Sequence, residues 1–342
     1  MVSNTRVGTH RLAIFIGRMA SNRLAGPTVV LVGLCVFFQL RSGKFFTATQ
    51  IEGMTSVAAS ISIISAGITM LMFSGEFDLS VASVYAIGPI LFALLLTKAD
   101  IWVFPAFLIA LILCSAVGLF NGLITTRFGI PSLITTLGSS FAIIGTAIFI
   151  SEGDNLLYFD ESRLFTILGG DVGNAPVPAQ FLWALLIVGV LWYVTDLTEY
   201  GNWSRSAGGR RGVAREMGVP VNRVKTTNFV VSSTLAGFAG IATFTSFRTV
   251  SAGYGSNFEL LAIVATVVGG TSIFGVTGSV LGAFIGTLIL ASLRTGLILV
   301  GAPGAWYTAI IGILLIAAVI SNIRIGRAGD RLLEVSQRWL KS

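Results

Sequence analysis

Long apolar runs, separated by short polar or glycine-rich stretches, alternate along the whole chain. A helix needs about 20 mainly apolar residues to cross the hydrocarbon core of a bilayer. The pattern therefore predicts an all-α, polytopic membrane protein with about ten transmembrane helices. The eighth run is short and is interrupted by Gly269-Gly270, so its ends are the least defined. The expected spans are 24–40, 53–73, 79–97, 102–126, 128–150, 179–195, 226–247, 259–273, 278–300 and 305–321.

The positions of the cations predict an orientation. Cytoplasmic loops of membrane proteins carry an excess of Lys and Arg. If the N-terminus is placed in the cytoplasm, 16 of the 22 cations fall inside, five fall outside, and Arg294 lies within a span. Both termini are therefore expected to be cytoplasmic. The inner cations lie in the arm 1–23, at Arg127, in the loop 196–225 and in the tail 322–342.

The same orientation divides the chain into an N-terminal arm, one transmembrane domain over 24–321, and a C-terminal tail. The longest external loop is then 151–178, which is rich in acidic residues and is the largest surface for an outside partner.

The composition excludes a large soluble protein. Hydrophobic residues make up 54% of the chain and charged residues only 11%, against roughly 25% charged in a typical soluble domain. The net charge of +7 follows from the orientation and requires no nucleic-acid partner. Cys35 and Cys114 lie within apolar runs and are interpreted as small buried residues. His10 is the only histidine, which excludes a metal site or a catalytic triad built on several histidines.

An acidic motif, 75–83, precedes the third run. Asp78 opens the run, where a carboxylate accepts hydrogen bonds from the free N–H groups of a helix start. That structural role is one interpretation, and a place on a transport path, together with Ser80, is the other. Glu76 is either a functional acid within the membrane or a solvated side chain at its edge.

A second polar motif combines Asn121-Gly122 with 130–138. Pro131 is expected to begin a helix that carries Thr135 and Thr136. Hydroxyl groups in membrane helices can bond to the preceding turn and support helix packing. They would equally suit a hydroxyl-lined path for a neutral solute, and both readings of Asn121, Thr135 and Thr136 stay open.

A third motif, 208–225, lies in the long inner loop. It predicts a short helix over about 213–217, followed by Gly218 and the turn before Pro220. An ordinary basic loop would satisfy the charge rule, whereas this compact order would form a rigid knob for a cytoplasmic partner. The knob comprises Arg210, Arg211, Ala214, Arg215, Glu216, Met217, Gly218 and Val219.

Two further features lie near the C-terminus. Gly269, Gly270 and Thr271 interrupt an apolar run, which indicates an unwound or re-entrant segment that lines a cavity or is covered by protein. Arg294 stands alone in its span. Its long stem either reaches the outer headgroups or faces the translocation path.

Together these motifs resemble the permease subunits of ribose-, galactose- and xylose-type ABC importers, within the branched-chain amino-acid/ribose permease superfamily. The resemblance covers roughly 50–320. The family pattern Gly-Gly-x-Asp-Leu-Ser-Val-Gly-Ser is similar to 75–83, except that Glu76 and Ala82 stand where glycine is usual. The segment from Glu259 through Gly282 matches the family pattern closely.

The resemblance implies the channel-forming subunit of an ATP-driven, binding-protein-dependent importer of a monosaccharide or a similar small polar solute. The chain would lie in the bacterial inner (plasma) membrane as a multi-pass protein, in contact with lipid. Its partners would be ATP-binding cassette subunits, a periplasmic or extracellular sugar-binding protein, and a second copy or a related permease. The 208–225 motif would be the coupling helix that docks on the ATP-binding subunit.

The chain has no Gly-x-x-x-x-Gly-Lys-[Ser/Thr] phosphate loop. It is therefore expected to be neither an ATPase nor another enzyme, to have no catalytic residue and no cofactor, and to leave ATP to a partner subunit. A proton- or sodium-coupled carrier is the alternative, but it would need ionisable groups at mid-membrane depth, and only Glu76 and Arg294 qualify. A receptor or scaffold is a third class, and no signalling domain supports it.

Overall fold

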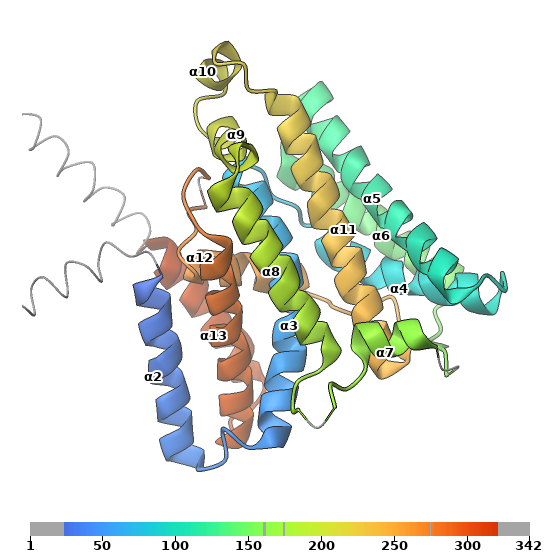
Figure 1. Cartoon of the computed structure of the whole chain (residues 1–342), viewed down its shortest axis with the longest axis vertical. Coiled ribbons are helices and arrows are strands. Elements are labelled where there is room, and N and C mark those ends of the chain that lie inside the picture. The colour runs from blue at the N-terminus through green and yellow to red at the C-terminus, as the bar shows by residue number, and fades with distance from the viewer. Residues whose placement is uncertain (1–23, 160–161, 174, 274, 321–342) are drawn as a thin grey trace, which may run out of the picture.

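The computed structural model describes residues 24–159, 162–173, 175–273 and 275–320, and these residues are mainly helical (Figure 1). The predicted arm 1–23 and tail 322–342 lie outside them. The elements are α2 (Ala25–Ser42), α3 (Ala48–Phe73), α4 (Val81–Thr97), α5 (Val103–Phe128), α6 (Ser132–Ile150), β1 (Leu156–Leu157), α7 (Arg163–Gly169), α8 (Ala179–Leu197), α9 (Glu199–Gly208), α10 (Arg211–Glu216), α11 (Val221–Phe247), β2 (Thr249–Val250), α12 (Phe258–Val268), α13 (Val280–Leu299) and a last helix, Ala305–Ile320.

Each expected span contains a helix, and seven helices of the described chain are long and apolar enough to cross a membrane. These seven are α2, α3, α5, α6, α8, α11 and α13. The prediction of a polytopic helical membrane protein is thus confirmed. The three other apolar helices are shorter, and α12, with 11 residues, is about half as long as a bilayer crossing requires. The count of ten crossings therefore stays a prediction.

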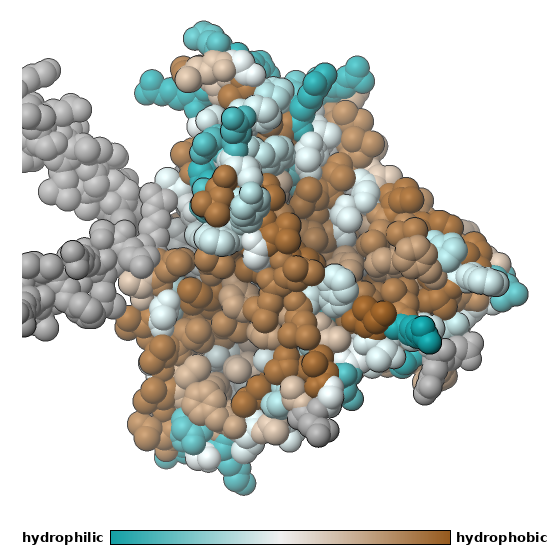
Figure 2. Space-filling view, viewed as in Figure 1, coloured by the Kyte–Doolittle hydropathy of each residue, from teal (hydrophilic) through white to brown (hydrophobic). Residues whose placement is uncertain are grey.

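The surface is divided in the way a bilayer requires. Hydrophobic residues cover the middle of the molecule, whereas hydrophilic residues gather over α9 and α10 at one end and at the opposite end (Figure 2). We call these the α10 end and the far end. Exposed apolar side chains on the long helices, such as Phe141 on α6 and Phe37 on α2, suit contact with lipid.

Helix α3 is the centre of the bundle. It packs against α8, α11, α12 and α13, and its side chains from Ala58 to Phe73 are buried. Hydroxyl pairs join it to three of these neighbours, and such bonds support helix association where water gives no hydrophobic drive. The pairs are Ser60–Thr243 on α11 (2.9 Å), Ser65–Thr287 on α13 (3.2 Å) and Thr69–Thr266 on α12 (3.2 Å).

Small residues bring α5 and α11 into close contact. A Cβ atom added to Gly118 would lie 2.8 Å from the Val230 Cα atom, and one added to Gly122 would lie 2.8 Å from the Thr226 Cα atom. Because the two glycines are one turn apart, they form a small-xxx-small face on α5. The backbone of α11 fills that face.

We therefore expect Gly118→Leu to separate α5 from α11 and to destabilise the bundle by about 1–3 kcal/mol or more through overpacking. The measurement is thermal unfolding of the purified protein in detergent. Gly145→Leu on α6 is the matched control, because no atom lies within 4 Å of the Cβ position there. Equal stability of the two variants would show that the close contact is not required.

The inner loop differs from the prediction. The stretch 196–225 was expected to contain one short helix, but α9 precedes that helix, and α11 begins at Val221 instead of residue 226. Helix α9 buries the small residues Gly201, Ser204 and Ala207, which a search for long apolar runs does not detect. The charge of Lys225 ended the apolar run in the sequence, although the helix continues through it.

Other boundaries also differ. The eighth span was expected to extend to residue 273, but α12 ends at Val268, because Gly270 adopts a φ of 92° that a helix cannot contain. Residues 129–131 separate α5 from α6, so the helix of the expected span 128–150 begins only at Ser132. The loop 151–178, which was expected to be external, contains secondary structure: α7 lies in it, and its strand β1 pairs antiparallel with β2.

Candidate functional site at the α3–α4 break

Residues 74–80 form an irregular segment between α3 and α4, which we call the α3–α4 break. Gly75 permits the turn with a φ of 74°. Backbone N–H groups in such a segment lose their helical partners and need others inside a membrane protein. The first turn of α6 supplies two: Ser132 Oγ accepts from the N–H of Phe77 (3.2 Å), and Thr136 Oγ1 accepts from that of Leu79 (3.0 Å).

Asp78 lies fully buried in this break. Its Oδ1 atom accepts hydrogen bonds from the N–H (2.9 Å) and the hydroxyl (2.5 Å) of Ser80, and its Oδ2 atom accepts from the Ser233 hydroxyl of α11 (3.3 Å). Asn121 on α5 donates to Ser80 Oγ (2.9 Å). Asp78 thus accepts a backbone N–H group directly before the helix, as its structural interpretation predicted, although α4 begins at Val81 and not at residue 79.

Glu76 is also buried, with 5% of its surface exposed, so its interpretation as a solvated edge residue is wrong. Its Oε1 atom accepts from Lys225 Nζ of α11 at 2.5 Å and from the Arg211 guanidinium of α10 at 2.9 Å. The Lys225 side chain is 3% exposed, whereas that of Arg211 is 59% exposed. A buried ion pair therefore continues to the surface through Arg211.

Two further segments lie against the break. At the end of α9, a Cβ atom on Gly208 would overlap the carbonyl oxygen of Phe73, so only glycine fits there. The irregular residues 269–273 and 275–279, between α12 and α13, approach from another side, where the Val276 N–H group donates to the same Phe73 oxygen at 3.4 Å. The four motifs that the sequence distinguishes therefore meet around one short segment.

The structure brings together five of the ten path candidates: Glu76, Asp78, Ser80, Asn121 and Thr136. Gly269, Gly270 and Thr271 begin the adjoining irregular stretch, and Thr135 is buried on α6. Arg294 is the exception, with an exposed side chain in the second half of α13. In this conformation the buried candidates connect helices. Their role on a translocation path stays a prediction.

Helix α10 forms the expected knob, although it spans 211–216 and not 213–217. Ala214 anchors it by packing with apolar residues of α9 and α11. Val213 and Met217 face outward, 48% and 80% exposed. Gly218, with a φ of 83°, reverses the chain before α11. Exposed apolar side chains on a polar end of the molecule are typical of a protein-binding surface.

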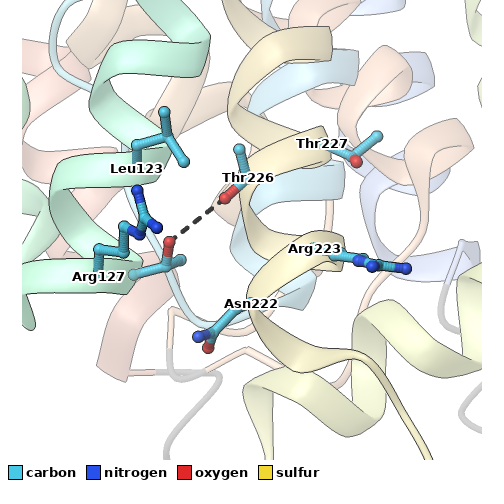
Figure 3. A pocket seen from close by; sticks show the side chains of 7 residues that line it. Leu123, Arg127, Asn222, Arg223, Thr226 and Thr227 are labelled. Carbon is cyan, nitrogen blue, oxygen red and sulfur yellow. Dashed lines mark hydrogen bonds between the residues drawn. The ribbon is translucent and has the colours of Figure 1, made fainter.

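A groove of about 410 Å³ lies beside this knob, between the end of α5 and the start of α11 (Figure 3). In the close-up, Arg127 and Arg223 lie on either side of Thr226, whose hydroxyl is bonded to that of Thr126 (3.3 Å). The groove therefore adds positive charge to the α10 end. Its lining comprises Leu123, Thr126, Arg127, Asn222, Arg223, Thr226 and Thr227.

Three site residues were missed by sequence reasoning. Lys225 was counted only as a loop charge, and Ser132 and Ser233 were not distinguished. The spacing of Val221, Val224 and Lys225 places all three on one buried face of α11, which would have indicated a buried lysine in need of a carboxylate. Among the described residues, no group of three or more His, Cys, Asp or Glu could hold a metal ion.

A multi-pass helical bundle with two irregular segments in its interior and an exposed short helix at one polar end has the architecture of a transport permease. The comparison with known families agrees. The chain belongs to the family described as the permease component of the branched-chain amino acid transport system, which matches residues 50–319.

The chain is similar to several sugar import permeases. The xylose/arabinose import permease protein XylH of Sulfolobus acidocaldarius is 34% identical over 275 residues, which cover 78% of this chain and 76% of the relative. The ribose import permease protein RbsC of Haemophilus influenzae is 29% identical, with 79% and 83% covered. The L-arabinose ABC transporter permease protein AraH of Azospirillum brasilense is 30% identical, with 80% and 79% covered.

The buried ion pair gives a stability prediction. Lys225→Met removes the buried partner of Glu76 and should destabilise the protein by about 3–5 kcal/mol, the usual cost of leaving one charge of a buried pair. The double variant Glu76→Gln/Lys225→Met removes both charges and should recover much of that loss. The measurement is unfolding in detergent–denaturant mixtures.

The control for this prediction is Lys98→Met at the far end. The exposed Lys98–Glu152 pair is 2.8 Å long, and the hydrogen bond and charge of Lys98 lower the pKa of the Glu152 carboxyl. Exposed pairs contribute little to stability, so this variant should unfold like the wild type. If Lys225→Met were equally harmless, the buried pair would not stabilise the site.

Proposed function

We propose that this chain is the channel-forming membrane subunit of an ATP-driven importer for a monosaccharide or a similar small polar solute. The family match over most of the chain carries this proposal, because the family consists of permease components. The names of the relatives favour sugars as the solute class. They also favour this reading over a proton- or sodium-coupled carrier.

The proposal requires partners. ATP would be bound and hydrolysed by ATP-binding cassette subunits, and a solute-binding protein outside the cell would deliver the sugar to two permease chains. The exposed apolar residues of α10 and the basic groove at the ends of α5 and α11 support docking of the ATP-binding subunit at the α10 end. A nucleic-acid partner has no role in this scheme.

We further propose that the α10 end faces the cytoplasm. Five cations lie at the α10 end, on α10 or in the adjoining α5–α11 groove, which is the charge excess expected of a cytoplasmic face. They are Arg127, Arg210, Arg211, Arg215 and Arg223. Both termini would then be cytoplasmic if all ten helical segments cross the bilayer. The membrane would be the inner, or plasma, membrane of the cell.

The energy source can be tested by reconstitution. The chain alone in liposomes should neither hydrolyse ATP nor accumulate sugar. Addition of its ATP-binding subunit and its solute-binding protein should produce ATP-dependent uptake of labelled xylose, arabinose or ribose. Uptake by the chain alone under a proton or sodium gradient would instead establish a secondary carrier.

The docking surface can be tested with Gly218→Trp. The indole group would occupy open space beside the exposed Met217 and strain a turn that needs a positive φ, so docking and ATP-dependent uptake should fall at least about tenfold. Gly43→Trp is the matched control: it has a φ of 67° and open surroundings, but it lies at the C-terminus of α2. Copurification with the ATP-binding subunit and sugar uptake are measured for both. Normal assembly of Gly218→Trp would exclude this surface.

A further inference from the structure

We propose that Glu76 is a positioning residue that joins α10 to the α3–α4 break, so that displacement of α10 changes the break through the Arg211–Glu76 ion pair. The proposal rests on the proposed function, since it takes α10 to be moved by an ATP-binding subunit. It goes further by assigning one side chain to the transfer of that movement into the membrane domain.

The two cations bound by Glu76 differ in exposure and in the helix that carries them. Lys225 belongs to α11, the long helix packed along α3, α4 and α5, and its side chain is 3% exposed. Arg211 is the first residue of the six-residue α10, and its side chain is 59% exposed. The Lys225 contact is therefore fixed by the bundle, whereas the Arg211 contact at 2.9 Å depends on the position of α10.

A change at Glu76 would reach other helices within a few residues. Phe77 and Leu79 are bonded to the first turn of α6, and Asp78 is bonded to Ser233 of α11. Because these bonds hold the break on several sides, it cannot absorb a shift of Glu76 locally. A shift of Glu76 would therefore also move the first residues of α6 and change the position of α11 relative to the break.

A second connection runs through the backbone. Gly208 at the end of α9 packs directly on the backbone of Phe73 and Gly75. This contact involves no charged side chain. The family pattern also usually has glycine where this chain has Glu76, so the ion pair would add to a backbone route and not replace it. Removal of the Arg211 contact should therefore reduce coupling without abolishing it.

The test compares two arginines of the same helix. Arg211→Gln removes the contact with Glu76 but leaves the buried Glu76–Lys225 pair intact. Arg215→Gln removes an equal charge from α10 but breaks only a 3.1 Å bond to Asn222. The two variants and Arg211→Lys are each assembled with the ATP-binding subunit and the solute-binding protein, and the ATP hydrolysis stimulated by sugar-loaded binding protein is measured.

We expect Arg211→Gln to lower this stimulation about fivefold or more, which is the lower range of coupling between distinct sites. Arg211→Lys should restore much of it because the charge is retained. Arg215 lies on the same docking knob, so the loss in Arg215→Gln should match its loss of binding to the ATP-binding subunit in copurification, whereas the loss in Arg211→Gln should exceed its loss of binding. A loss in Arg211→Gln that only matches its loss of binding would mean that α10 charge acts through docking alone, and normal stimulation in Arg211→Gln would mean that the pair transmits nothing. Either result overturns the proposal.

Hydrogen exchange of the permease alone in detergent gives a readout that does not depend on the partners. The backbone amides of residues 76–80 should exchange faster in Arg211→Gln than in the wild type. Their exchange rates in Arg215→Gln should equal those of the wild type. If the wild-type complex shows no stimulation, the proposed function fails, while the exchange data still decide whether Arg211 holds the break. Unchanged exchange in Arg211→Gln would overturn the link.

Discussion

The need to satisfy backbone polar groups away from water governs the centre of this protein. The chain leaves helical geometry at residues 74–80, next to its most buried helix, and each freed N–H group there would cost several kcal/mol in hydrocarbon. Hydroxyl groups one turn apart on α6 and the carboxylate of Asp78 meet part of that need. The break is thus stable only where α5, α6 and α11 surround it, and the arrangement of these helices depends on it.

The same constraint explains why small and polar residues connect the bundle. Apolar side chains gain little from leaving lipid for a protein interior, so close backbone contact and hydrogen bonds determine which helix faces join. Gly118 and Gly122 provide the contact between α5 and α11, and the hydroxyl pairs along α3 provide the bonds. The Glu76–Lys225 pair adds specificity: both charges are buried and neither tolerates the loss of the other, so α11 has one favourable position relative to the break.

The positions of the helices could be predicted from the sequence more fully than the burial and the partners of their polar side chains. Hydropathy located the apolar helices, and the glycine and proline positions located α10, because these signals act within a few residues. The Gly269-Gly270 interruption was recognised, but the expected span still extended to residue 273, beyond the end of α12 at Val268. The burial of Glu76 could not be deduced in this way, since its partner Lys225 is far away in the sequence. Helix α9 was missed because its buried face consists of Gly201, Ser204 and Ala207, which have no hydrophobic run.

The burial of the site also limits where a solute can pass. Apart from Arg294, the residues that the sequence suggested for a path are buried or half-buried between helices of one chain, and their polar groups largely bond to protein. A path for sugar must therefore use surfaces that one chain leaves exposed, or must form when helices around the α3–α4 break separate. The first route agrees with the proposed pairing of two permease chains. In that arrangement the α3–α4 break would not line the path itself. It would instead set the positions of the helices that line the path.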